Sequence, residues 1–114
     1  MSDSPKATTV PNTISLDAQI GQAWDYHYKR QNEQALPLFQ ALVEQNPSHI
    51  DANYGLALVL ATLHQNARAI EVFKYTAELV QTRMTQQAAD DEDSRYRMLA
   101  RMIDQQLEVL TRGT

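Results

Sequence analysis

Residues 32–39 read NEQALPLF and residues 66–73 read NARAIEVF, and these two stretches decide the fold. They lie 34 residues apart, and residues of similar size recur at this distance within them and beyond them. The matching pairs are Ala35 and Ala69, Leu36 and Ile70, Phe39 and Phe73, Ala23 and Ala57, and Tyr26 and Leu60. Small residues recur where two helices must approach closely, and large ones recur where a gap must be filled. The spacing therefore predicts two copies of one helix–turn–helix unit.

The apolar residues around the two stretches recur at steps of three and four, which is the pattern of amphipathic helices. They predict a first helix after Ser15, a second over 32–46, a third from about His49 and a fourth from Asn66 to about Ala88. No stretch alternates between apolar and polar residues as a half-buried strand does. The predicted fold class is therefore all-α.

Polar residues at the helix starts are predicted N-caps, because their side chains accept hydrogen bonds from free backbone N–H groups. These caps are Ser15 for the first helix, Asn32 for the second, Ser48 for the third and Asn66 for the fourth. Asp51, three residues after Ser48, resembles the acidic partner of a capping box. Pro37 lies inside the second predicted helix, where a proline removes one backbone hydrogen bond.

A fifth helix is predicted over about 93–112, after the acidic run from Asp90 to Asp93, and Gly113 can end it. Its apolar stripe consists of Leu99, Met102, Ile103, Gln106, Leu107 and Leu110. Its charged residues Arg95, Arg97, Arg101 and Asp104 are expected to face water. A helix with one apolar side suits the end of a stack, so we expect it to cap the exposed side of the second copy.

The composition excludes several classes of function. The chain has 114 residues, which allows one domain, and its net charge of -4 without a basic stripe argues against binding to nucleic acid. It has no cysteine, which rules out disulfides, thiolate zinc sites and cysteine nucleophiles. Its three histidines form no metal-ligand motif and its three glycines form no phosphate-binding loop. We therefore expect no catalysis, no metal and no cofactor.

Segments that would direct the chain to a membrane are not apparent in the sequence. The start carries Asp3, Ser4 and Pro5 where a secretory signal needs an apolar core, and no later segment approaches a membrane span. A cytoplasmic location without membrane insertion is therefore expected.

The repeated residues resemble the tetratricopeptide repeat (TPR), which has a small residue and a Tyr in its first helix, Ala-x-x-x-Phe in its second and a closing Pro. The first copy meets this pattern with Ala23, Tyr26, Ala35, Phe39 and Pro47. The second copy keeps Ala57, Ala69 and Phe73, and departs with Leu60 for the aromatic residue and Gln81 for the proline. Of these residues, Tyr26 and Phe39 are expected in the core.

The TPR resemblance implies a domain organisation and an architecture. It implies repeats over 16–49 and 50–83 and the capping helix over about 93–112, all within a single domain over 14–112. Residues 1–13 are small and polar, contain proline and show no helical period, so this segment is expected to be flexible. The implied architecture is a short right-handed solenoid of about five helices, in which antiparallel hairpins stack on one another.

In TPR proteins the first helix of each repeat lines a concave groove that holds a peptide or a helix of a partner. The corresponding residues here are Ile20, Trp24, His27, Tyr28, Tyr54, Leu58 and Ala61. The resemblance thus implies a non-catalytic adaptor, scaffold or chaperone-like module, with a protein or peptide partner whose identity the sequence does not give. Trp and Tyr are the residues that concentrate binding energy at such surfaces.

Two alternatives stay open at the level of the sequence. In the first, Trp24, Tyr28 and Tyr54 are buried under the N-terminal segment or under the fifth helix, and the groove is closed. In the second, the apolar ends of the short solenoid join copies of the chain into a homo-oligomer.

Overall fold

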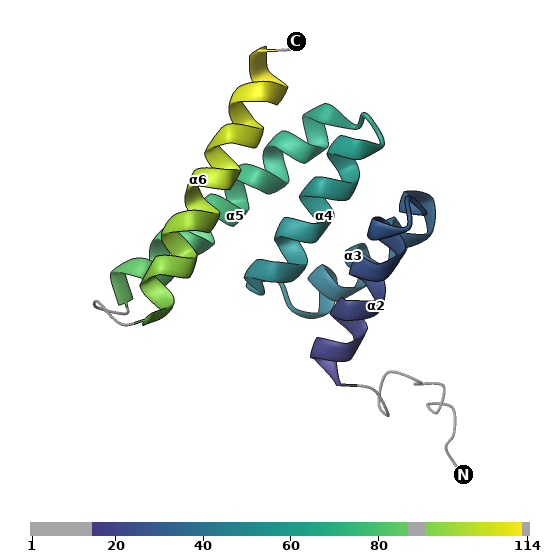
Figure 1. Ribbon diagram of the computed structural model, residues 1–114, viewed down its shortest axis with the longest axis horizontal. Coiled ribbons are helices and arrows are strands. Elements are labelled where there is room, and N and C mark those ends of the chain that lie inside the picture. Colours follow the sequence, from purple (N-terminus) through teal and green to yellow (C-terminus); the bar gives the residue numbers. More distant parts are fainter. Residues whose placement is uncertain (1–14, 87–90, 113–114) are drawn as a thin grey trace.

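The computed structural model describes the backbone over residues 15–86 and 91–112 and the side chains over 15–86 and 95–112. Within these ranges the chain forms helices and no strand, so the all-α prediction is confirmed there. The helices are α2 (Leu16–Tyr28), α3 (Asn32–Gln45), α4 (Ile50–Thr62), α5 (Asn66–Gln86) and α6 (Asp91–Arg112) (Figure 1). The segment 1–13 that was predicted to be flexible, the side chains of the acidic run and Gly113 lie outside the described residues.

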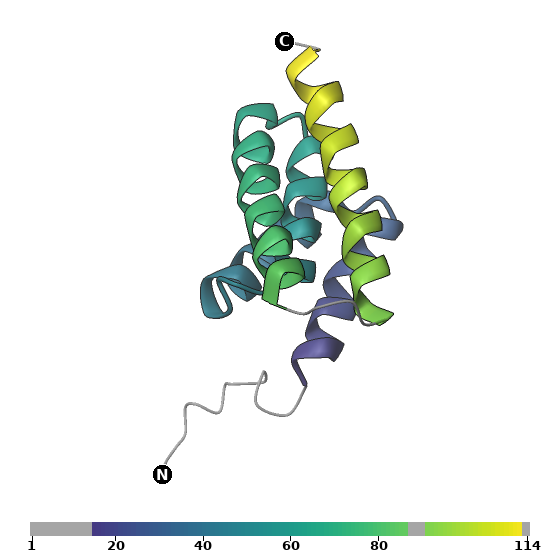
Figure 2. The ribbon, with the colours of Figure 1, turned by 90° about the vertical axis from the view of Figure 1, so that its left-hand side faces the viewer.

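Consecutive helices form antiparallel hairpins that pack against one another (Figure 1). Helix α2 packs on α3, α3 on α4, α4 on α5 and α5 on α6, and α2 also contacts α4. A view turned by 90° places α5 on one side of the molecule and α2 and α6 on the other (Figure 2). The first helices of the two hairpins are therefore neighbours. The described helices together form one stack, which we call the row, and α4 lies in its middle.

The turns that follow α2 and α4 have the same conformation. Arg30 and His64, which lie 34 residues apart, are the non-glycine residues of the described chain with positive φ, at 63° and 65°. The residue after each donates its N–H to a carbonyl of the preceding helix, at 2.8 Å in the first turn and 2.9 Å in the second. This backbone closure satisfies a free carbonyl at a helix end. Its recurrence supports the 34-residue duplication at the level of backbone geometry.

The start of α2 agrees with its predicted cap, whereas the start of α3 does not. Ser15 accepts a hydrogen bond from the N–H of Ala18 at 3.1 Å. The cap of α3 is Gln31, and Asn32 is instead the first residue of the helix. The Oδ1 atom of Asn32 lies 2.6 Å from Nδ1 of His27, so this buried amide is engaged by a side chain of α2 and does not cap the backbone.

The predicted caps of α4 and α5 are also wrong. His49, and not Ser48, caps α4, because its extended backbone lets Nδ1 accept a hydrogen bond from the N–H of Ala52 at 3.2 Å. Helix α5 already includes Asn66, and the residue before it, Gln65, offers the first accepting carbonyl. In each case the helix starts one residue away from the predicted position.

Helices α5 and α6 are the longest in the described chain, with 21 and 22 residues. Helix α5 continues past Met84 to Gln86 as predicted, and Ala88 lies outside the described residues. Helix α6 begins two residues before its predicted start. Its apolar stripe packs inward through Ile103 and Leu110, which are buried, and through Leu99 and Leu107, which are partly buried. The charged residues Arg95, Arg97, Arg101 and Asp104 are exposed, as expected.

The matching pairs of the two repeats occupy equivalent places in the core. Phe39 and Phe73 are fully buried, and so are Ala35 and Ala69. Burial of each phenylalanine side chain contributes about 1.5–3 kcal/mol relative to exposure. The core prediction fails for Tyr26, which is 37% exposed. Helix α2 ends the described row, so its outer side has no neighbouring helix there, whereas α4 has helices on both sides.

Candidate functional site

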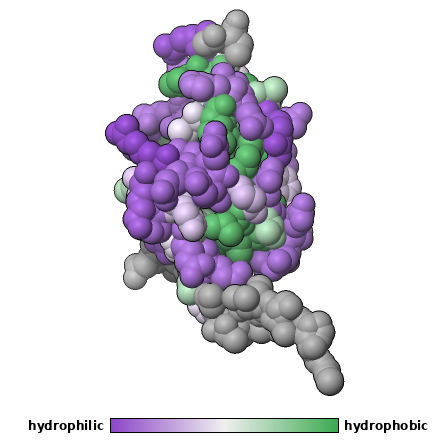
Figure 3. Space-filling model, turned by 90° about the vertical axis from the view of Figure 1, so that its right-hand side faces the viewer, coloured by the Kyte–Doolittle hydropathy of each residue, from purple (hydrophilic) through white to green (hydrophobic). Residues whose placement is uncertain are grey.

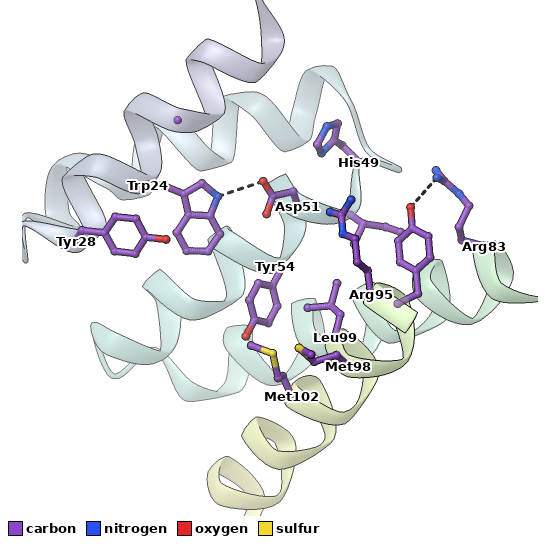
Figure 4. Close-up of a pocket in the computed structure, with 13 residues that line it drawn as sticks. Trp24, Tyr28, His49, Asp51, Tyr54, Arg83, Arg95, Met98, Leu99 and Met102 are labelled. Carbon is purple, nitrogen blue, oxygen red and sulfur yellow. Dashed lines mark hydrogen bonds between the residues drawn. The ribbon is translucent and has the colours of Figure 1, made fainter. Parts of the chain in front are cut away.

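A hollow of about 880 Å³ lies between α2, α4 and α6 (Figure 4). Its lining residues come from α2, α4 and α6, with His49 from the cap of α4 and Arg83 from near the end of α5. We call this hollow the groove. Its lining residues are Gly21, Trp24, Tyr28, His49, Ile50, Asp51, Tyr54, Arg83, Arg95, Tyr96, Met98, Leu99 and Met102.

The α2 wall of the groove is formed by Gly21, Trp24 and Tyr28, which share one side of the helix because they are spaced by three and four residues. The rings of Trp24 and Tyr28 are stacked with their centroids 5.8 Å apart. Trp24 also meets the buried ring of Phe39 edge-on at 5.3 Å. The partly buried indole of Trp24 is therefore held on its core side by Phe39. Tyr28, which is 73% exposed, extends the aromatic surface outward.

The α4 wall is formed mainly by Tyr54 and Asp51. Tyr54 is only 8% exposed, and its ring lies 6.3 Å from Trp24 and 6.1 Å from Phe73. Burial raises the pKa of the Tyr54 hydroxyl above its usual value. Asp51 accepts a hydrogen bond at 3.3 Å from Nε1 of Trp24, which ties the first helices of the two repeats together across the groove floor.

The α6 wall carries Met98, Leu99 and Met102. Met98 is 63% exposed and Met102 is 40% exposed, so two flexible apolar side chains stand in solvent opposite the aromatic residues of α2 and α4. Methionine adapts its shape to irregular partners and makes favourable contacts with aromatic rings. The groove is thus aromatic on one side and rich in methionine on the other.

Two arginines stand at one end of the groove, and Tyr28 stands at the other (Figure 4). Arg83 of α5 donates a hydrogen bond from Nη1 to the hydroxyl of Tyr96 at 3.0 Å, and its guanidinium carbon lies 5.7 Å from the centre of that ring. Arg95 of α6 is exposed. The two arginines of the groove lining therefore come from α5 and α6.

The structure brings three of the seven predicted groove residues together and places four elsewhere. Trp24, Tyr28 and Tyr54 line the groove. The other four face the core or the α2–α3 turn: Ile20 is buried, Leu58 and Ala61 pack against the core, and His27 faces Asn32. Because α4 has packed neighbours on both sides, Leu58 and Ala61, which the TPR resemblance assigned to the groove, are partly buried against the core.

The contribution of α5 and α6 to the groove was not predicted from the sequence. Arg95 was expected simply to face water, and Leu99 and Met102 were expected to cover the second repeat. A usable signal was present, because Arg95, Met98, Leu99 and Met102 are spaced by three, four and seven residues and so share one side of a helix. The sequence did not indicate on which side of α4 helix α6 lies.

The residues that the structure describes carry neither a candidate metal site nor a candidate membrane span. No group of three His, Cys, Asp or Glu residues there is placed to hold a metal ion. No helix described in the structure has the length and apolar character needed to cross a membrane. The cytoplasmic location expected from the sequence stays a prediction.

The comparisons with known proteins identify a fold and no closer relationship. Among solved structures, the chain is similar to the tetratricopeptide repeat domain protein of Salinibacter ruber, with a TM-score of 0.59 and 18% sequence identity. The match covers 80% of this chain and 97% of that chain. No protein-family model matches the sequence, and no curated protein matches it either. The predicted TPR-like fold is thereby confirmed, while the repeat boundaries at 16–49 and 50–83 and the single-domain organisation stay predictions.

Proposed function

We propose that this TPR-like chain is a non-catalytic protein-interaction module that binds a peptide or helix of a partner protein in the groove between α2, α4 and α6. Helical repeats of this kind use the concave side of the stack as an extended binding surface. The proposal assigns the contact to Trp24, Tyr28 and Tyr54, together with the methionines of α6.

The observation that carries the proposal is the exposed apolar surface around the groove. Tyr28, Met98 and Met102 remain 73%, 63% and 40% exposed, although each stands beside a hollow large enough for several side chains of a ligand. Soluble proteins rarely leave contiguous apolar surface uncovered unless it takes part in an interaction. Aromatic residues held rigid from below suit this role, because little conformational entropy is lost when they bind.

Gly21 offers a way to block the groove without disturbing the core. A Cβ atom built on Gly21 has no other group within 4 Å, so a larger side chain there projects into open space inside the groove. Gln22 is the matched control, because it is exposed on the same helix and does not line the groove.

The experiment compares Gly21→Phe and Gln22→Phe after a binding partner has been identified by affinity capture. Isothermal titration calorimetry with the purified partner should give at least about a tenfold loss of affinity for Gly21→Phe, because a filled hollow excludes the partner's anchor side chains. Gln22→Phe should bind as the wild type does, and both variants should retain the helical circular dichroism spectrum. Equal affinity of the two variants would show that the partner binds elsewhere.

The second candidate function is self-association through the end of the row formed by α2 and α3. Tyr26 and Leu38 are each 37% exposed on these helices. The side of the molecule where α2 and α3 lie in Figure 1 shows an interrupted strip of hydrophobic residues between hydrophilic ones (Figure 3). Light scattering over a hundredfold range of concentration tests this function, and a monomer at every concentration removes it.

A further inference from the structure

We infer that the groove selects an acidic partner segment, one that places apolar side chains between the aromatic residues and the methionines and a side-chain carboxylate against Arg95 and Arg83. This inference rests on the proposed function and adds the chemistry of the partner to it. The carboxylate belongs to an aspartate or glutamate within the segment, not to the end of a chain.

The charged side chains that line the groove carry a net charge opposite in sign to that of the whole chain. The protein has a net charge of -4, whereas the ionised side chains of the groove are Arg83, Arg95 and Asp51, which leaves one positive charge in excess. A carboxylate of a bound segment can therefore meet opposite charge at the two arginines of the lining.

The two arginines differ in how firmly they are held. The guanidinium of Arg83 is partly buried and is fixed by the hydroxyl and the ring of Tyr96, at 3.0 Å and 5.7 Å. A guanidinium has five N–H donors, so the single bond to Tyr96 leaves donors free for a carboxylate. Arg95 is exposed, and it has no hydrogen bond or ion pair within the described part of the chain. Arg83 provides a preorganised contact and Arg95 an adaptable one.

Asp51 gives the bound segment a direction. Its carboxylate lies beside Trp24 and accepts the indole N–H, so it presents negative charge in the middle of the groove (Figure 4). A second carboxylate brought there meets a like charge, which is unfavourable. The acidic residue of the partner is therefore confined to the arginine end, and its apolar residues occupy the end formed by Trp24, Tyr28 and Met102.

A peptide selection on the full chain tests whether the groove prefers segments that combine acidic and apolar residues. A library of random 12-residue peptides, each fused through its C-terminus to a phage coat protein, is selected on the wild type after depletion on the Gly21→Phe variant. The fusion removes the free terminal carboxylate, so any acid that is selected is a side chain. We expect the retained peptides to be enriched in Asp or Glu beside aliphatic or aromatic residues.

The outcomes of the selection separate this inference from the proposed function. Retained peptides without an excess of acids, or with an excess of Lys and Arg, overturn the inference and leave a working groove. If no peptide is retained after depletion, the proposed function fails, and the inference fails with it.

A charge reversal in α6 then tests the arginine contact with a selected acidic peptide, synthesised with an amidated C-terminus and a fluorophore. Arg95→Glu should weaken its binding about tenfold or more in fluorescence anisotropy, because it replaces attraction by repulsion at the contact. Arg101→Glu is the matched control, since it changes the net charge equally on an exposed site of the same helix outside the groove. Its effect should stay within about twofold at 0.15 M salt, where charges more than about 8 Å apart are screened. Equal losses in the two variants overturn the assignment of Arg95.

Discussion

Helices α2 and α4 are the first helices of two copied hairpins, and each has 13 residues. Only Ile20 and Ala23 are buried in α2, whereas eight residues are buried in α4. The difference arises from position, because α4 has helices packed on both sides and α2 stands at the end of the described row. The comparison shows that similar spacing of apolar residues fixes the helix but not the extent of its burial.

The two helices also carry a glycine at the same place, and the two glycines do different things. Gly21 and Gly55 are 34 residues apart. A Cβ atom on Gly55 would lie 2.5 Å from Cζ and 2.9 Å from Cδ1 of Phe39, so the absent side chain lets α4 approach the ring of α3. A Cβ atom on Gly21 meets nothing within 4 Å. The same residue thus allows close packing in one repeat and leaves the groove open in the other.

Gly55→Ala is the change with the largest expected effect on stability. The added methyl group gains about 1 kcal/mol of helix propensity but collides with a fully buried ring, and overpacking of this kind costs about 1–3 kcal/mol or more. We expect a net loss of about 1–2 kcal/mol in the free energy of unfolding, measured by urea titration with circular dichroism at 222 nm. A more stable Gly55→Ala variant would mean that Phe39 moves aside freely and that the close approach of α3 and α4 is not required.

The fold was predictable from the sequence because its determinants are local or repeat at a fixed distance. The 34-residue spacing of Ala35 from Ala69 and of Phe39 from Phe73 predicts both hairpins from the sequence alone. The caps were less predictable: Asn32, Ser48 and Asn66 are all good cap residues, yet the actual caps are displaced by one position. Whether a polar side chain faces the backbone or another side chain, as Asn32 faces His27, depends on tertiary packing.

The candidate groove was predictable only for the part formed by α2 and α4. Trp24, Tyr28 and Tyr54 follow from the repeat, since the first helices of successive repeats face the same side. The wall that carries Met98 and Met102 does not follow from it, because α6 has no matching partner in the repeat. Likewise, Arg83 reaches the groove because α5 extends beyond the length of its counterpart α3.

Gly21→Ala should change the free energy of unfolding in the opposite direction to Gly55→Ala and by a smaller amount. The new methyl group meets open space, and alanine favours the helix over glycine, so we expect a gain of about 0.5–1 kcal/mol in the free energy of unfolding. The same urea titration measures it, and the two glycine variants serve as controls for each other. A loss of stability in Gly21→Ala would indicate that this side of α2 is covered in solution, which would contradict an open groove.

The smallest expected effect concerns Tyr54, which stands where the first repeat has Ile20. At pH 7 Tyr54→Phe should change the stability by less than about 1 kcal/mol, because no described residue forms a hydrogen bond with the hydroxyl.

At high pH the stabilities of the wild type and Tyr54→Phe should differ. Burial raises the pKa of Tyr54 in the folded state, so the neutral phenol stabilises the fold below the unfolded pKa of about 10. That stabilisation is lost as the pH rises from about 10 through the folded pKa. Urea titrations at intervals from pH 9 to pH 11 should therefore show a shallower loss for Tyr54→Phe than for the wild type. Parallel losses would show that water reaches the hydroxyl, and that the groove floor at α4 is as open as the wall at α2.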